Sequence, residues 1–228
     1  ADVAVAEAKQ NHCGYMLYDK SNDEHRLFQL TLERELRHAI DNDELELYFQ
    51  PQLNLKTGEL WGAEALVRWH HPDRGFISPD QFIPLAEQSG LVHPLTLWVL
   101  NDALKHSALW LSNGFPLKVS VNISARSLHV KELPILVSQV LEQWQMASKY
   151  LSLEITESAV MEDPSSALVI LGQLDEMGVE LSIDDFGTGY SSMMYLKKLP
   201  VDELKIDRSF IHEMKRGGSD EAIVRSII

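Results

Sequence analysis

The feature of this sequence that most restricts its fold is a repeated alternation of short apolar segments with longer amphipathic ones. The apolar segments are typical of strands, and the segments between them have helical periodicity, so each strand and its helix take about thirty residues. Strands joined through helices run parallel to one another, and the pattern therefore predicts an α/β fold with a mainly parallel sheet. The expected strands lie in "LELYFQPQLNLKTGELWGAEALVRW", which holds two strands and a turn, and in "LKVSVNIS", "LSLEITES", "VELSIDDFG" and "VDELKIDRSF".

The segments between the strands predict helices. The first follows "SNDE" and carries an apolar stripe of helical spacing, formed by Phe28, Leu32, Leu36 and Ile40. Two later helices are expected to end near glycines, at Gly114 and Gly178. The remaining predicted helices are "PDQFIPLAEQSG", "PLTLWVLNDALKHSALWLSNG", "KELPILVSQVLEQW", "SSALVILGQLDEMG" and "YSSMMYLKKLP".

Net charge and cysteine content exclude several classes of function. The formal net charge is −14 and the sequence pI is about 5.0, whereas a non-specific binder of nucleic acid or of anionic membranes needs a basic surface. Cys13 is the only cysteine, so we expect no internal disulfide and no thiolate zinc site, which fits a cytoplasmic protein. No signal peptide is recognisable, and the most apolar stretch, residues 91–111, is interrupted by Pro94 and polar residues, so no membrane span is expected.

Polar side chains stand near the carboxyl ends of consecutive predicted strands. In α/β barrels these ends converge on one rim, where catalytic groups lie. Taken singly, each has an ordinary explanation: a carboxylate can cap a helix or form a salt bridge, an asparagine can close a turn, and a lysine can reach solvent. The residues are Glu64, Asn122, Glu154 with Glu157, Asp184 with Asp185, and Lys205 with Asp207.

Together these side chains favour a site for hard divalent cations that acts on a phosphodiester. Oxygen donors of this kind suit Mg²⁺ or Mn²⁺, and Asp185 beside Asp184 could let a second cation bind. Two ions about 3.5–4 Å apart can clamp a phosphodiester and activate water, and Lys205 offers a fixed positive charge to the reacting groups. The four predicted ligands of the first ion are Glu64, Asn122, Glu154 and Asp184.

Five motifs in this order resemble the EAL-domain family of bacterial cyclic di-GMP phosphodiesterases. Each motif alone is weak evidence, but the combination is specific and covers roughly residues 27–228. They are "EALVRW" from Glu64, "VNIS" from Val121, "LEITES" from Leu153, "DDFGTGYSS" from Asp184 and "LKIDRSFI" from Leu204.

The resemblance implies a modified TIM-type (β/α)₈ barrel whose first strand runs antiparallel to its neighbours. It implies a hydrolase of bacterial second-messenger signalling, a phosphodiesterase that opens cyclic di-GMP to linear pGpG with Mg²⁺ or Mn²⁺, using two ions. Calcium is expected to inhibit, because its longer and looser coordination suits in-line displacement poorly. The alternative is a non-catalytic EAL domain that binds cyclic di-GMP, or only a protein partner, without cleaving it.

Residue roles follow from the same resemblance. Glu64, Asn122, Glu154 and Asp184 match the metal ligands, and Asp185 matches the aspartate of the second metal. Glu64, Asp185 and Lys205 match catalytic positions, with the lysine helping to place the attacking water. Arg68 in "EALVRW" and Gln50 in "YFQPQ" match substrate contacts, and a guanidinium suits phosphate.

The resemblance also implies a regulatory loop after Asp185 that is anchored by Glu157 and linked to homodimerisation. Its glycines give the backbone freedom to order around the second cation. For Glu157 the simpler reading is a cap of the following helix. The loop residues are Phe186, Gly187, Thr188 and Gly189.

Two expectations concern the ends of the sequence. Residues 1–25 resemble the tail of a GGDEF (diguanylate cyclase) domain with a linker. The resemblance implies an upstream GGDEF or sensory domain, through which the protein could be tethered to a membrane. The alternative is an unrelated linker helix. Residues 26–228 are expected to form the EAL domain. Six strand segments are two fewer than the barrel needs, so its C-terminal strands are expected to be missing.

Overall fold

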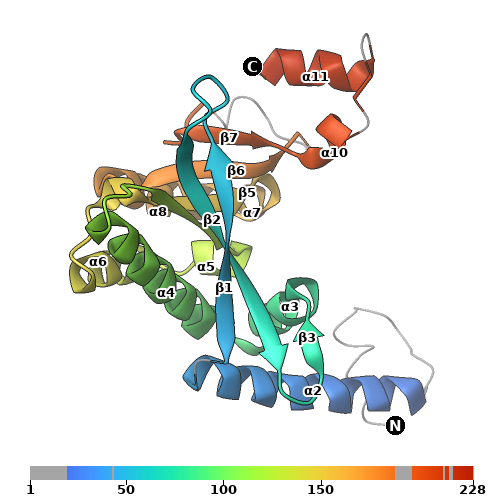
Figure 1. Cartoon of the computed structure of the whole chain (residues 1–228). Coiled ribbons are helices and arrows are strands. Elements are labelled where there is room, and N and C mark those ends of the chain that lie inside the picture. Colours follow the sequence, from blue (N-terminus) through green and yellow to red (C-terminus); the bar gives the residue numbers. More distant parts are fainter. Residues whose placement is uncertain (1–19, 43, 188–196, 213, 216–217, 228) are drawn as a thin grey trace. The chain divides into compact units, whose positions relative to one another are not determined.

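The structure is a computed structural model that describes residues 20–42, 44–187, 197–212, 214–215 and 218–227 (Figure 1). The chain divides into two compact units. The first unit contains the chain up to Leu45 together with Trp69–Leu91, and the second contains Glu46–Arg68 and Val92–Ile228. The predicted GGDEF-like tail falls mostly on residues 1–19, which lie outside the described residues.

The second unit is built on a sheet whose strands follow the order β1-β2-β4-β5-β6-β7. From β2 to β7 each strand pairs in parallel with the next, whereas β1 runs antiparallel beside β2 (Figure 1). The α/β prediction, with its antiparallel first strand, is therefore confirmed. The strands are β1 (Leu45–Leu53), β2 (Leu60–His71), β4 (Lys118–Ile123), β5 (Leu151–Thr156), β6 (Glu180–Phe186) and β7 (Glu203–Ile206).

Helices cover the apolar face of this sheet. Helix α4 (Val92–Ser112) packs on β4, α8 (Pro164–Glu176) packs on β6, and α6 (Leu133–Gln143) contacts both helices. Successive strand residues point to opposite faces, so the apolar residues of β4, β5 and β6 meet the helices while the alternate polar residues face the other side. The buried apolar residues are Val119, Val121, Ile123, Leu151, Leu153, Ile155, Leu181 and Ile183.

The predicted helix ends in the second unit are confirmed. Helix α4 ends at Ser112, two residues before Gly114, and α8 ends at Glu176, two residues before Gly178. Gly178 has a φ of +76°, a left-handed conformation that stops a helix and that glycine adopts without steric cost. Helix α8 begins at Pro164, where the side chain of Asp163 accepts a hydrogen bond from the backbone N–H of Ser166 at 3.2 Å.

The first unit packs α2 (Lys20–Asp41) against α3 (Pro79–Ser89). Leu32 and Leu36 of the predicted stripe are buried, as is Trp69, whose ring meets Phe82 edge-on at 5.7 Å. Helix α2 begins at Lys20, before the predicted start after "SNDE". The helix therefore extends through the predicted junction at residues 25–26.

Short elements that the periodicity did not predict follow several strands. Two of them form where a side chain turns the backbone: Thr156 caps α7 by accepting from the N–H of Ala159 at 3.3 Å, and Asp207 at the start of α10 accepts from the N–H of Ser209 at 2.9 Å. The predicted strands "LSLEITES" and "VDELKIDRSF" therefore end earlier, at Thr156 and Ile206. These elements are β3 (Gly75–Ile77), α5 (Ala125–Leu128), η1 (Ser148–Tyr150), α7 (Glu157–Glu162), α10 (Arg208–His212) and α11 (Ser219–Ile227).

The predicted helix "YSSMMYLKKLP" lies mostly outside the described residues, and Lys197 and Lys198 form a turn. Among the helices of the described ranges, none combines the length and the apolar character that crossing a bilayer requires.

Candidate active site

Five side chains from five different strands meet at one end of the parallel sheet in the second unit. The register explains the meeting, because Asn122 on β4 stands opposite Glu154 on β5 and Asp184 on β6 stands opposite Thr156, the last residue of β5. The polar strand ends of the sequence are thus brought together by parallel pairing. The five are Glu64 (β2), Asn122 (β4), Glu154 (β5), Asp184 (β6) and Lys205 (β7).

Lys205 lies at the centre of this group. Its Nζ donates to Oε2 of Glu154 at 2.6 Å and to Oε2 of Glu64 at 3.0 Å, and it lies 3.8 Å from Oδ1 of Asp184. Asn122 closes the ring, with its Nδ2 donating to Oε1 of Glu64 at 2.8 Å. One ammonium therefore faces three carboxylates, and the group carries surplus negative charge.

This surplus appears in the pKa values of the group. Burial raises the pKa of Glu154 to about 7, in spite of the hydrogen bond and charge of Lys205, and the charges of Glu64 and Asp184 raise it further. Burial by itself would lower the pKa of Lys205, but the hydrogen bond and charge of Glu154, with the two other carboxylates, outweigh burial and raise it. The pKa of Glu154 is thus raised mainly by burial, and the pKa of Lys205 is raised by the carboxylates around it.

The donor set fits a hard divalent cation. Within the described ranges no three His, Cys, Asp or Glu side chains are already arranged around a metal position, since the carboxylates are drawn toward the ammonium of Lys205. Carboxylate and amide oxygens from four strands nevertheless surround one small space, which is the donor chemistry of Mg²⁺ and Mn²⁺. The second oxygen of Glu154, Oε1, is buried without a hydrogen-bond partner among the described residues, and a cation at the other oxygens would supply the missing positive charge.

Asp185 lies beside this group but faces a different neighbour. Its φ is +53°, a left-handed conformation uncommon for a non-glycine residue, at an irregularity where the β6–β7 register shifts. This backbone turns its carboxyl toward Asp207, at the end of β7. The pKa of Asp185 is raised by burial, by the charge of Asp184 and by its hydrogen bond with Asp207. Asp207 is a site residue that sequence reasoning placed at a strand end without giving it a role.

Glu157 anchors the backbone that follows the paired aspartates. It is buried as the first residue of α7, and its Oε2 accepts a hydrogen bond from the N–H of Gly187 at 2.9 Å. The helix-cap reading of Glu157 is wrong, because Thr156 caps this helix. Gly187 has a φ of +101°, and an added Cβ would lie 2.9 Å from Cε2 of Phe210. Phe186 is buried, while Thr188 and Gly189 of the predicted loop lie outside the described residues.

The predicted substrate contacts lie on β1 and β2. Gln50 is exposed on β1, and Arg68 is half-buried on β2, four residues after Glu64. The Arg68 guanidinium stands over the ring of Tyr48 at 5.6 Å, within the range of a cation–π contact, and its Nη1 donates to the carbonyl of Val67 at 2.9 Å. Sequence reasoning missed Tyr48, although it stands two residues before Gln50 and so shares its strand face.

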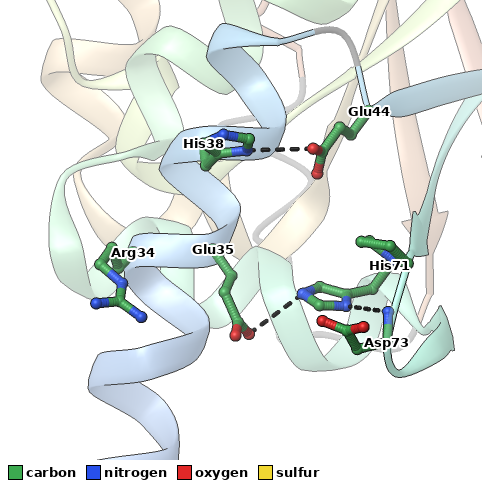
Figure 2. Close-up of a pocket in the computed structure, with 7 residues that line it drawn as sticks. Arg34, Glu35, His38, Glu44, His71 and Asp73 are labelled. Atoms are coloured by element: carbon green, nitrogen blue, oxygen red, sulfur yellow. Dashed lines mark hydrogen bonds and ion pairs between the residues drawn. The ribbon is translucent and has the colours of Figure 1, made fainter.

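A separate pocket of about 310 Å³ lies in the first unit and contains none of the predicted site residues (Figure 2). Nδ1 of His71 accepts from the N–H groups of Asp73 and Arg74, at 3.1 and 3.3 Å, so His71 holds the turn after β2. Its Nε2 lies 3.3 Å from Oε2 of Glu35. The segment after His71 therefore forms a turn, at residues 72–74. The lining residues are Arg34, Glu35, His38, Glu44, His71, Pro72 and Asp73.

Known proteins resemble this chain over most or all of its length. The chain is 44% identical to the bifunctional diguanylate cyclase/cyclic di-GMP phosphodiesterase MucR of Pseudomonas aeruginosa, in an alignment of 230 residues that covers 100% of this chain. It is 46% identical over 201 residues, 88% of its length, to the cyclic di-GMP phosphodiesterase NbdA of the same species. The chain spans only 34% and 26% of the length of these two relatives.

Solved structures show the same fold. A structure of the PaMucR phosphodiesterase in complex with c-di-GMP superposes with a TM-score of 0.82 at 45% identity, covering 86% of this chain and 80% of that one. The EAL enzyme Bd1971, in a form with cAMP and cyclic di-GMP bound, gives a TM-score of 0.81 at 35% identity, covering 90% and 56%. The family profile described as the EAL domain matches residues 33–228. This chain therefore belongs to the EAL domain family.

Proposed function

We propose that this chain hydrolyses one phosphodiester bond of cyclic di-GMP, giving linear pGpG, with Mg²⁺ or Mn²⁺ as cofactor. The observation that carries the proposal is the meeting of Glu64, Glu154 and Asp184, from three strands, around the ammonium of Lys205. A site with surplus negative charge repels a phosphodiester unless divalent cations intervene. The names and ligands of the relatives support the choice of substrate.

The oxygen atoms that each residue offers suggest which cation it would bind. Oxygens of Glu64, Asn122, Glu154 and Asp184 hold one cation, and Asp185 with Asp207 holds a second. Bound divalent cations would polarise the phosphodiester and activate the attacking water. The chain's own part is to fix the positions of these oxygens: the hydrogen bond from Asn122 orients Glu64, and the left-handed backbone at Asp185 turns its carboxyl toward Asp207.

Two cationic side chains act on the substrate in this proposal. Lys205 keeps its proton at neutral pH, because surrounding carboxylates raise its pKa, so it orients the attacking water and stabilises the charge that develops on the phosphate. Arg68, held over Tyr48, binds a phosphate of the dinucleotide, and Gln50 on the adjacent strand contacts the same ligand.

The test is incubation of the protein with cyclic di-GMP and Mg²⁺ or Mn²⁺, with the product separated by chromatography. We expect linear pGpG, and we expect Ca²⁺ to inhibit its formation. Glu64→Ala should abolish turnover, while Glu176→Gln, which changes an exposed carboxylate on α8, should not. Binding of cyclic di-GMP without product would identify a non-catalytic receptor and refute the proposal.

The proposed setting is bacterial second-messenger signalling in the cytoplasm. The first 25 residues would be the tail of a GGDEF-like domain, in line with the name of the bifunctional relative MucR. The Glu157–Gly187 hydrogen bond would couple the site to a homodimer by fixing the start of the regulatory loop. Light scattering of the protein and of Glu157→Ala, with and without Mg²⁺, tests this coupling. Equal masses and equal turnover in both proteins would refute it.

A further inference from the structure

A serine precedes a proposed cation ligand by two residues in three consecutive strands. Residues two apart on a strand point to the same face, so each serine lies one step deeper on the sheet face that carries the ligands. The serines are called the serine layer below. The pairs are Ser120 with Asn122 on β4, Ser152 with Glu154 on β5, and Ser182 with Asp184 on β6.

The serine layer is buried and lacks partners. Ser120, Ser152 and Ser182 are 1%, 1% and 0% exposed, and none of their hydroxyl oxygens has a hydrogen-bond partner among the described residues. The register places Ser120 opposite Ser152, and it places Ser182 one step further along the sheet, opposite Glu154. Oε1 of Glu154, next to them, is also buried without a partner.

Four buried polar atoms in one place call for a common explanation. A buried hydroxyl without a hydrogen bond is costly, and native proteins contain few such groups. The interior of a β/α barrel is usually filled by layers of bulky branched side chains, yet this sequence places its Val, Leu and Ile residues at the alternate positions that face the helices. Serine is small, so the serine layer fills less of the space next to Glu154 than branched apolar side chains would.

We propose that the serine layer binds ordered water, and that one of these molecules donates a hydrogen bond to Oε1 of Glu154 and so positions this carboxylate. Water can satisfy both kinds of group, because it donates to an ionised carboxylate oxygen, which only accepts, and it can donate to or accept from a serine hydroxyl. Oε2 of Glu154 is already taken by Lys205. The carboxylate is thus held from both sides, as outer groups orient metal ligands elsewhere. The second part of this inference rests on the proposed function, but the binding of water does not.

The test uses a matched pair, Ser152→Thr and Ser152→Val, whose side chains have nearly the same shape and differ by the hydroxyl. Ser152→Ala, which adds no bulk, is a third variant in case the larger side chains disturb folding. Isothermal titration with Mn²⁺ measures affinity, thermal unfolding measures stability, and steady-state hydrolysis separates kcat from KM. A high-resolution crystal structure of the protein shows the contents of the serine layer.

We expect water within hydrogen-bonding distance of at least two of the serine hydroxyls. Ser152→Val and Ser152→Ala should lower Mn²⁺ affinity about tenfold and lower kcat without raising KM, while Ser152→Thr should stay near the parent. A serine layer filled by another protein side chain, or equal Mn²⁺ affinity for the Thr and Val variants with greater stability for Val, would overturn the inference. If the parent hydrolyses nothing, the proposed function fails, but the crystal structure and Mn²⁺ titrations still decide this inference.

Discussion

The ammonium of Lys205 lies 2.6 Å from a carboxylate oxygen of Glu154, a side chain with no solvent exposure. The same ammonium reaches Glu64 at 3.0 Å. A buried carboxylate is stable only when it is paired or protonated. Lys205 therefore compensates part of the negative charge at the centre of the site, and a divalent cation would compensate the rest.

Lys205→Met tests this compensation. Without the ammonium, the carboxylates repel one another, so the cation-free variant should be less stable than the parent. Mg²⁺ should raise its melting temperature by more than it raises that of the parent, because more charge is left to compensate. Hydrolysis should fall at least about a hundredfold, the usual cost of a lost transition-state donor. Parent-like stability in EDTA would contradict the assignment of Lys205.

Glu154 makes cation-free stability depend on pH. Its pKa is raised from 4.5 to about 7, so the folded protein keeps a proton that the unfolded chain releases in this interval. The contribution of Glu154 to stability is complete below about pH 4.5 and is lost as the pH rises through about 7. In urea unfolding with EDTA, the parent should lose up to about 3 kcal/mol more than Glu154→Gln between pH 5 and pH 8. Parallel pH profiles would contradict this expectation.

Asp207 is expected to serve the second cation only. Asp207→Asn keeps the shape of the side chain but removes the charge that faces Asp185, so it should weaken the second binding event in a Mn²⁺ titration by about tenfold. The first binding event, at the oxygens around Lys205, should change little. Asp163→Asn, which alters the cap of α8, is the matched control. Loss of both binding events together would show that Asp207 supports the fold and not one cation.

Gly187 is expected to tolerate no side chain. Gly187→Ala places a Cβ 2.9 Å from the Phe210 ring at a φ of +101°, which costs about 1–3 kcal/mol of strain. The hydrogen bond to Glu157 should weaken, and kcat should fall. Gly58→Ala is the control, because Gly58 also has a positive φ but its Cβ would meet no atom within 4 Å. Equal effects at both glycines would show that conformation alone, without the Phe210 contact, explains the loss.

Arg68 is expected to act in substrate binding. Arg68→Lys keeps the charge but loses the planar contact with Tyr48 and two-point binding of phosphate, so KM for cyclic di-GMP should rise about tenfold with kcat nearly unchanged. Tyr48→Phe should behave like the parent, because the ring suffices for the cation–π contact. An unchanged KM in Arg68→Lys would remove Arg68 from the substrate site.

The strand pattern and the candidate site could be predicted from the sequence, because both depend on the order of residues within each strand. Apolar and polar residues alternate along β4, β5 and β6, and this alternation can be recognised in the amino-acid sequence. Glu64, Asn122, Glu154, Asp184 and Lys205 could be grouped from sequence alone because parallel strands bring equivalent ends together. The short helices α7 and α10 could not be predicted, because each depends on one capping contact rather than on periodicity.

Sequence alone determined which side chains are polar at each strand end and that the sheet is mainly parallel. Tertiary structure alone decided that Lys205 is the common neighbour of the carboxylates, that a left-handed Asp185 faces Asp207, and that three serines lie buried below and beside Glu154. The physical reason is that side-chain alternation is fixed within a strand. Register, backbone irregularities and burial arise only when one strand pairs with the next.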